Sequence, residues 1–533
     1  MGPFRRAMAW LHTWAGVVIG SVLFAIFWMG TLTVFDQEFD RWMQPGTRIA
    51  APAAPVSLDR TVLPAVTALA DGNLQWGVRF PDERTAHLRL FARKADGEFV
   101  TRAVDGTTGT LIAEQGSLAG TGFFFPFHFH LHIDWLGLGY WLVGLAGMAM
   151  LVLLVSGVII HKKIFADFFL FRPKKYLQRA SLDLHNLTGV LGLPFHFLIT
   201  LSGLIIFVQI YFPQAYEGAY GTGKQAQAAF QIEAIGRYTR PRLEQPGQLA
   251  SLDAMVAEAE RLWPGGKATF VRVWHPGDAG AYVEVRRSYA HEVTMNLDQL
   301  YFDGQTGALL YRFEARPVVG VHRFISGMHF IQFNHWGLRW LYFLAGLSGC
   351  VMIATGFLFW LESRRASHAK KGLSGVRVVE ALTVGSVSGI VLATMAYLVV
   401  NRLLPLDTHF AGQARAELEV WVFYLVWLGT FFHAAWRRAE APGQPARRAW
   451  SEQCWAIAAL ALLAVVLNAV TTGDHLVRTL MRGDWQVAGL DLMLLLGAAL
   501  AAWAAVRIKQ VRQNKPGTRA KAAAANKTEG ARG

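Results

Sequence analysis

Residues 140–160, YWLVGLAGMAMLVLLVSGVII, contain no charged side chain. An α-helix needs about 20 apolar residues to cross the ~30 Å hydrocarbon core of a bilayer, so this stretch is predicted to span a membrane. Similar stretches recur along the chain. We expect a polytopic α-helical membrane protein with about eight spans, at 12–35, 137–160, 188–212, 340–361, 376–400, 418–436, 453–471 and 487–508.

The overall composition also favours a membrane protein. Of the 533 residues, 53% are hydrophobic and 17% are charged, which overrides the several soluble domains that the length alone would suggest. The first span is not expected to be a cleaved signal peptide. Its apolar run is too long, and FDQEFDRW (35–42) follows it instead of a small-residue cleavage site.

Lys and Arg near the span ends predict the orientation. Arg5 and Arg6 precede the first span, and basic clusters follow the second, fourth, sixth and eighth spans. Both termini are therefore expected in the cytoplasm, and residues 36–126 and 213–330 outside, in a periplasm. The formal net charge of +14 is explained by this topology and by contact with anionic lipid, so no nucleic-acid partner is expected.

The first 365 residues contain an internal repeat. LHTWAGVVIG (11–20) matches LHNLTGVLGL (184–193) at an offset of 173, and the second and fourth spans match at an offset of 199. DGTTGTL (105–111) matches DGQTGAL (303–309), and each follows a strand-like alternation. The Asp-Gly-x-Thr-Gly sequence predicts a β-hairpin turn with a glycine at positive φ. A helix–small α+β domain–helix unit is thus used twice, which predicts a pseudo-two-fold axis along the membrane normal.

Histidines gather at the ends of the predicted spans, where polar residues are costly and suggest function. His12 and His185 start the first and third spans, His161 ends the second, and His196 lies within the third. On the external side, FHFHLH (127–132) precedes the second span and His329 precedes the fourth. His409, His433 and His475, in or beside the later spans, are not expected to be ligands.

The register of the external histidines stays open. His329 aligns with His130 at an offset of 199, or with His132 if the loop has a two-residue gap. His128 and His132 share a face if the stretch is helical, whereas all three histidines share a face if it is extended. His185 and His196 are eleven residues apart, so in one straight helix they would project from one face about 16 Å apart along the axis.

Imidazole pairs between facing helices are typical of haem ligation. Zinc would be expected to draw on Cys or carboxylate ligands as well, and the spans hold few carboxylates and only Cys350 and Cys454. We therefore expect two haem groups at two depths. The inner pair would be His12 with His185, with His196 or His161 as a replacement member, and the outer pair would be His132 or His130 with His329.

Several stretches resemble the PepSY-associated transmembrane proteins, over about residues 5–365. They are LHTWAG (11–16), FHFHLH (127–132), SGVIIHKKIFADFFLFRP (156–173), DLHNLTGVLGLPFH (183–196) and MHFIQFNHWGLRWLYFLAG (328–346). Within that family the chain is similar to inner-membrane ferric-siderophore reductases of the ferrioxamine type. The resemblance implies haem b in a bacterial inner membrane and electron transfer to a ferric siderophore in the periplasm. It implies cofactor-binding roles for His12, His128, His132, His161, His185, His196 and His329.

The resemblance also suggests how the chain is divided. Two PepSY-like periplasmic domains, 37–126 and 213–327, separate the first transmembrane helix (1–36), the second and third helices with a cytoplasmic loop (127–212), and the fourth helix (328–365). A C-terminal four-helix region (366–509) and a basic tail expected to be disordered (510–533) follow. Trp76, Trp263, Trp274 and Tyr282 are candidate substrate contacts, although core packing of a small domain accounts for each as well.

The electron donor is expected to be a separate molecule, a quinol or a cytoplasmic reductase. No Gly-x-Gly-x-x-Gly unit occurs, and no cytoplasmic segment is large enough for a flavin or nicotinamide domain. The basic segment 161–179 either docks an acidic partner or only sets topology and contacts lipid. Two other functions remain open: a permease for siderophore or iron, and a PepSY-type regulator of a periplasmic protease. The spans lack the paired carboxylates expected of a coupled permease, and a regulator would leave the histidines unexplained.

Overall fold

The computed structural model describes residues 2–69, 74–94, 97–161, 172, 176–440 and 446–510. The chain divides into two compact units, each of which is described by itself. The first comprises Met1–His12, Ile26–Ile164 and Thr188–Gly349, and the second Thr13–Ala25, Phe165–Leu187 and Cys350–Gly533. The predicted tail and most of the basic segment 161–179 lie outside the described residues.

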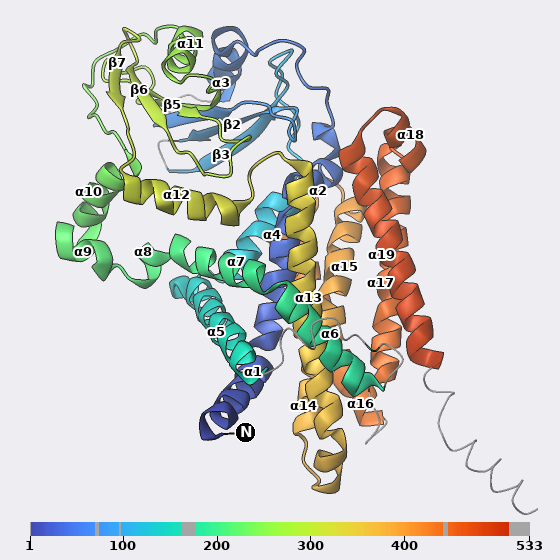
Figure 1. Ribbon diagram of the computed structural model, residues 1–533. Helices are drawn as coiled ribbons and strands as arrows, with labels where there is room; N and C mark the ends of the chain where they lie inside the picture. The colour runs from blue at the N-terminus through green and yellow to red at the C-terminus, as the bar shows by residue number, and fades with distance from the viewer. Residues whose placement is uncertain are drawn as a thin grey trace, which may run out of the picture. The chain divides into compact units, whose positions relative to one another are not determined.

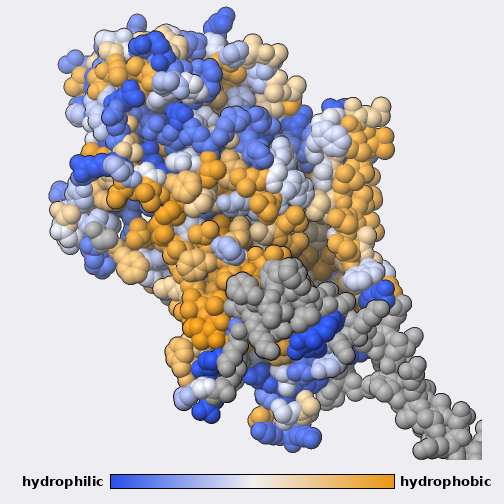
Figure 2. Space-filling model, in the orientation of Figure 1, coloured by the Kyte–Doolittle hydropathy of each residue, from blue (hydrophilic) through white to orange (hydrophobic). Residues whose placement is uncertain are grey.

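Within the described residues, seven helices are long and apolar enough to cross a membrane, or eight if one bent pair counts as a span. This confirms a multi-pass helical membrane protein. Figure 2 shows hydrophobic side chains gathered over helices of the first unit and hydrophilic ones over its sheet. The straight spans are α1 (Pro3–Thr33), α5 (Leu138–Ile160), α13 (Trp336–Lys370), α14 to α15 (Gly375–Leu403), α16 (Arg415–Glu440), α17 (Arg447–Thr472) and α19 (Trp485–Gln510).

The third predicted span is not one helix. Two helices, α6 (Leu177–Leu191) and α7 (Leu193–Ile206), meet at an angle of 64°, and a short α8 (Val208–Tyr211) follows. Pro194 explains the break, because proline lacks an N–H and its ring clashes with the carbonyl four residues earlier. The prediction that His185 and His196 share one face of a straight helix is therefore wrong.

The two predicted external domains meet in a single seven-stranded antiparallel sheet of order β3-β2-β1-β4-β5-β6-β7 (Figure 1). Strand β1 pairs with β4, which joins the halves through backbone hydrogen bonds. This pairing covers two edges that would otherwise stay open. The first half supplies β1 (Gln75–Arg79), β2 (Leu88–Arg93) and β3 (Phe99–Val104); the second supplies β4 (Ala268–Trp274), β5 (Tyr282–Arg287), β6 (Gln299–Asp303) and β7 (Leu309–Arg312).

The two Asp-Gly-x-Thr-Gly sequences form the predicted turns. Gly109 N–H donates to the carbonyl of Asp105 at 2.8 Å, and Gly307 N–H donates to that of Asp303 at 2.9 Å. Gly109 and Gly307 have φ of 74° and 71°, a conformation that glycine adopts at low cost. The hairpin prediction is confirmed in both halves.

One face of the sheet packs against η2 (Leu58–Val62), α3 (Leu63–Leu69) and α11 (Leu252–Leu262), shown above the strands in Figure 1. Trp76 and Trp263 are buried in this core, so they serve packing rather than substrate contact. The first residues of η2 and α11 cap each other. Asp253 accepts from Leu58 N–H at 2.6 Å, and Asp59 accepts from Leu252 N–H at 2.8 Å, so each half caps a helix of the other.

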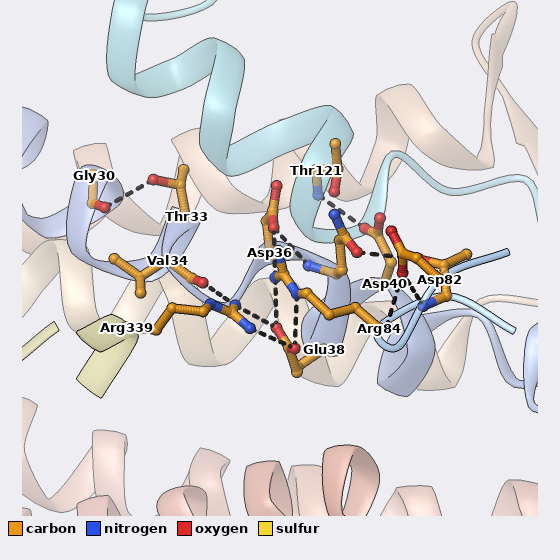
Figure 3. A network of polar contacts seen from close by, with 12 residues as sticks. Gly30, Thr33, Val34, Asp36, Glu38, Asp40, Asp82, Arg84, Thr121 and Arg339 are labelled. Atoms are coloured by element: carbon orange, nitrogen blue, oxygen red, sulfur yellow. Dashed lines mark hydrogen bonds and ion pairs between the residues drawn. The ribbon is translucent and has the colours of Figure 1, made fainter. Parts of the chain in front are cut away.

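A buried ion cluster ties the sheet to the helices of the first unit (Figure 3). Glu38 on α2 (Asp36–Met43) lies between two guanidinium groups, at 2.8 Å from Arg84 Nη2 and 3.1 Å from Arg339 Nη2. Arg339 also donates to the carbonyl of Val34, just past the end of α1. Burial by itself raises the pKa of Glu38, but Arg84 and Arg339 together lower that pKa to about 2. The carboxylate therefore holds a sheet loop, α1 and α13 together.

We expect Glu38→Gln to destabilise the protein by about 3 kcal/mol or more, because it leaves two buried guanidinium groups without their counter-charge. Thermal melting in detergent micelles at pH 7 measures the loss. The difference from wild type should shrink as the pH falls from about 4.5 to about 2, since a carboxyl with a lowered pKa contributes stability only while ionised. Glu258→Gln, at an exposed pair with Arg261, should leave the melting temperature nearly unchanged. Equal melting temperatures for both variants would contradict this role of Glu38.

Candidate functional site

Two half-buried histidines of the first unit lie against each other. His128 lies on α4 (Ala119–His130) and His329 on α12 (Pro317–Phe330), with ring centroids 6.0 Å apart and planes inclined by 29°. The structure thus brings His128, rather than His130 or His132, against His329. The physical reason is the end of α4: Leu131 and His132 have φ of 56° and 50°, which turns His132 back so that its Nε2 lies 2.9 Å from the carbonyl of Phe123.

The two facing histidines are held in the same way. His128 Nδ1 lies 2.9 Å from the carbonyl of Ile26, and His329 Nδ1 lies 2.9 Å from that of Ile199. A Cβ on Gly30 would lie 2.6 Å from His128 Cε1, and one on Gly203 would lie 2.8 Å from His329 Cε1. Both the carbonyls and the glycines correspond at the repeat offset of 173, so these are equivalent slots.

His12 and His185 occupy a second pair of equivalent slots, one in each unit. His12 Nδ1 lies 3.0 Å from the carbonyl of Leu153, and its ring lies against Gly157. His185 Nδ1 lies 2.8 Å from the carbonyl of Met352, and its ring lies against Gly356. These carbonyls and glycines correspond at the offset of 199. Four histidines are therefore anchored alike, each on the carbonyl four residues before a glycine.

This anchoring fixes the chemical form of the imidazole. A carbonyl only accepts hydrogen bonds, so Nδ1 carries the proton in the neutral ring and Nε2 carries the lone pair. Burial lowers the pKa of His128, and burial together with the charge of His128 lowers the pKa of His329 to about 3. Both residues lie outside the membrane-spanning helices. Both rings are thus neutral at physiological pH, the form that ligates metals.

His196 is buried without a repeat counterpart, because Leu23 stands at its equivalent position. Its Nε2 lies 3.3 Å from the carbonyl of Ala345 and 3.2 Å from Ser348 Oγ. Its Nδ1 is buried with no hydrogen-bond partner among the described residues. The ring lies between Gly192 and Gly349, where a Cβ would come within 2.4 and 3.3 Å. This histidine therefore has one nitrogen available for a further ligand.

The other predicted histidines are placed differently. His161 directly follows α5, and its Nδ1 is buried without a hydrogen-bond partner in the described part of the chain. His130 Nδ1 lies 3.5 Å from Asp134 Oδ1. Neither ring shares the carbonyl-and-glycine slot of the four anchored histidines.

The facing pair suits a cofactor that brings its own ligands. Metal–imidazole bonds are about 2 Å long, so two rings on opposite sides of one metal have centroids roughly 6 Å apart. The 6.0 Å between His128 and His329 matches this distance. No group of three or more His, Cys, Asp or Glu side chains that could hold a metal ion occurs in the described ranges. A haem, which supplies four in-plane nitrogens, fits two histidines better than a bare ion does.

The helices of the second unit contain a polar chain that the sequence did not reveal. At the π-helix η4 (Gly385–Gly389), Ser388 Oγ donates to Gln453 Oε1 at 2.6 Å. The Gln453 amide lies 3.3 Å from His433 Nδ1, and His433 Nε2 lies 2.9 Å from Glu452 Oε2. His433 is thus a hydrogen-bonded residue of the helix bundle.

Comparison with known proteins identifies the family of the chain. The model of the PepSY-associated TM region matches residues 9–363. The chain belongs to this family. It is also 29% identical over 385 residues to the uncharacterized protein PA4219 of Pseudomonas aeruginosa, an alignment that covers 67% of this chain and 88% of the relative. The family match ends before α14, so α14 to α19 lie outside the matched range.

We expect Gly203→Ala to destabilise the protein by about 1–3 kcal/mol, because the new methyl group would overlap His329 and force its ring out of the slot. Thermal melting in micelles measures the effect. Gly497→Ala on α19 is the matched control, since a Cβ there meets no atom within 4 Å. A Gly203→Ala protein as stable as wild type would contradict a tight imidazole slot.

Proposed function

We propose that this chain is a haem-containing reductase of the bacterial inner membrane, which passes electrons across the membrane to an Fe(III)-siderophore in the periplasm. The observation that carries the proposal is the 6.0 Å approach of two identically anchored imidazoles, one from each half of the repeat. The second pair of equivalent slots, at His12 and His185, supports a second haem b nearer the cytoplasm.

His128 and His329 would hold the outer haem through Nε2. His12 and His185 would hold the inner haem, with His196 as the alternative inner ligand because of its unpaired buried nitrogen. His132 is not assigned, since its Nε2 is engaged with the carbonyl of Phe123. When bound, haem iron supplies one-electron transfer at a potential set by its ligands and burial.

The chain's own residues prepare this chemistry. Each Nδ1–H donates to a backbone carbonyl, which orients the ring and makes Nε2 a better donor. Both rings are only partly exposed, which limits the access of water to them. The substrate would be Fe(III) held by hard oxygen donors, and one electron converts it to Fe(II), which such donors hold less tightly.

The electron would come from a separate donor on the cytoplasmic side, a quinol or a cytoplasmic reductase. A permease for siderophore or iron, or a regulator of a periplasmic protease, has no need for two pairs of histidines that are anchored alike. The reductase accounts for these histidines and for the glycines opposite them with one cofactor.

The purified protein should show a Soret band, with α and β bands that sharpen on reduction by dithionite, and a pyridine haemochrome assay should find about two haem b per chain. His329→Ala should remove about half of this haem, because the outer haem would lose one of the two histidines proposed to hold it. His291→Ala, at an exposed residue, should retain all of it. A wild-type protein without haem, or a His329→Ala variant with full haem content, would refute the assignment.

Electron delivery can be tested by mixing the dithionite-reduced protein with an Fe(III)-siderophore in the absence of oxygen. We expect the reduced haem bands to decay while Fe(II) appears in a ferrozine assay, and His128→Ala to slow the decay at least about tenfold because the outer ligand pair is lost. The His291→Ala protein should react like wild type. Equal rates in all three proteins would exclude the His128–His329 pair from the electron path.

A further inference from the structure

The sheet has a second face, opposite its packed core, on which charged and aromatic side chains alternate with the core residues. One row across four strands pairs Phe91, Gly77, Arg272 and Glu284. The adjacent rows bring Phe270 and Trp274 beside Arg272 on β4, and Arg286 beside Glu284 on β5. We call Phe91, Phe270, Arg272, Trp274, Glu284 and Arg286 the arginine–aromatic face.

Arg272 is at the centre of this face. Its guanidinium carbon lies 5.4, 5.2 and 5.1 Å from the ring centroids of Phe91, Phe270 and Trp274. Gly77 provides the space, because a Cβ there would lie 2.4 Å from the Phe91 ring. Arg272 Nε is buried and has no hydrogen-bond partner among the described residues. A guanidinium group is thus held among three aromatic rings.

The face carries more positive than negative charge. Glu284 is its one carboxylate, 3.8 Å from Arg272 Nη1 and in close contact with Arg286 Nε. Trp274 Nε1 also donates to Glu284 at 3.2 Å. Burial lowers the pKa of Arg272, against the opposing effect of Glu284. A partly desolvated cation of this kind gains most from an anionic partner.

The arginine–aromatic face is on the same side of the sheet as α12, the helix that carries His329 (Figure 1). Helices α3 and α11 cover the other side of the sheet, and α12, which carries His329, runs along the opposite side (Figure 1). The segment after β5 links the sheet to this helix region, since Met295 N–H donates to the carbonyl of Arg323 at 3.1 Å and Asn334 N–H to that of Ala290 at 2.7 Å. A ligand on this face would lie on the side of the sheet that faces His329.

We propose that the arginine–aromatic face binds an anionic iron(III) chelate whose metal is held by aryl oxygens, phenolate or catecholate, in preference to a neutral hydroxamate chelate. Aryl rings stack on guanidinium groups and on tryptophan, and their oxygens supply negative charge that Arg272 and Arg286 can bind. A tris-hydroxamate complex of Fe(III) offers neither a ring nor a net charge. The inference rests on the proposed reductase function for the identity of the metal and deepens it by naming the substrate class.

The test measures binding alone, on the full-length oxidised protein in micelles with no electron donor. Radiolabelled Fe(III) complexes of 2,3-dihydroxybenzoate and of acetohydroxamate are passed through an ultrafilter that retains the protein. We expect saturable retention of the aryl complex and at least about tenfold weaker binding of the hydroxamate complex. Arg272→Gln should weaken binding of the aryl complex by a similar factor, and Arg272→Lys should restore only part of it, because lysine keeps the charge but not the planar group.

Arg312→Gln is the matched control, at an exposed arginine of the same sheet outside the face, and should bind like wild type. Arg286→Gln provides a second variant if Arg272→Gln has a lowered melting temperature. Equal retention of both complexes by wild type, or wild-type affinity in both face variants, would overturn the proposal. Displacement of the aryl complex by poly-L-glutamate would also overturn it, in favour of an acidic protein segment.

Failure of the binding proposal can be told apart from failure of the reductase proposal. If the protein binds the aryl complex selectively but neither contains haem nor reduces the complex, the reductase proposal fails and the binding face stands. If it reduces both complexes and binds them equally, the reductase stands and the selectivity fails.

Discussion

The histidine pair depends on one requirement: a half-buried imidazole must find an acceptor for its Nδ1–H between helices whose carbonyls are already bonded. A helix carbonyl accepts the N–H four residues later and keeps a second lone pair, which the side chain at that later position normally shields. A glycine at that position exposes the lone pair. Ile26 with Gly30 and Ile199 with Gly203 show this arrangement, and the rings of His128 and His329 lie in the spaces that the missing Cβ atoms leave.

Sequence reasoning predicted what is local and periodic. The apolar runs, the repeat offsets and the two Asp-Gly-x-Thr-Gly turns follow from side-chain pattern and turn chemistry. The structure confirms both turns and seven of the eight predicted spans, whereas the third is bent. The histidine that lies against His329 could not be predicted from the sequence, because it depends on the residue at which α4 ends. His128 and His329 are separated by 201 residues rather than by 199. The pairing of β1 with β4 is a non-local contact for which neither strand carries a sequence signal.

The two halves of the repeat have diverged where they meet. At the repeat offsets, Tyr211 stands in place of Glu38 and Tyr140 in place of Arg339. Tyr211 Oη donates to the carbonyl of Tyr140 at 2.9 Å, so a neutral hydrogen bond replaces a buried ion pair. Equivalent positions therefore make a contact between the two halves at both places, but only the contact between Glu38 and Arg339 is charged. His196, with Leu23 at its equivalent position, is a second departure from symmetry.

Each facing histidine is anchored within its own half: His128 on α1 and His329 on α7. Their separation is therefore set by the contacts that join one half to the other. The β1–β4 pairing and the reciprocal caps at Asp59 and Asp253 join the halves at the sheet, and Glu38 with Arg339 joins them beside the helices. Two ligands from different halves can hold one metal only if such contacts keep the halves from separating. The merged sheet and the buried ion cluster therefore fix the distance between the two histidines.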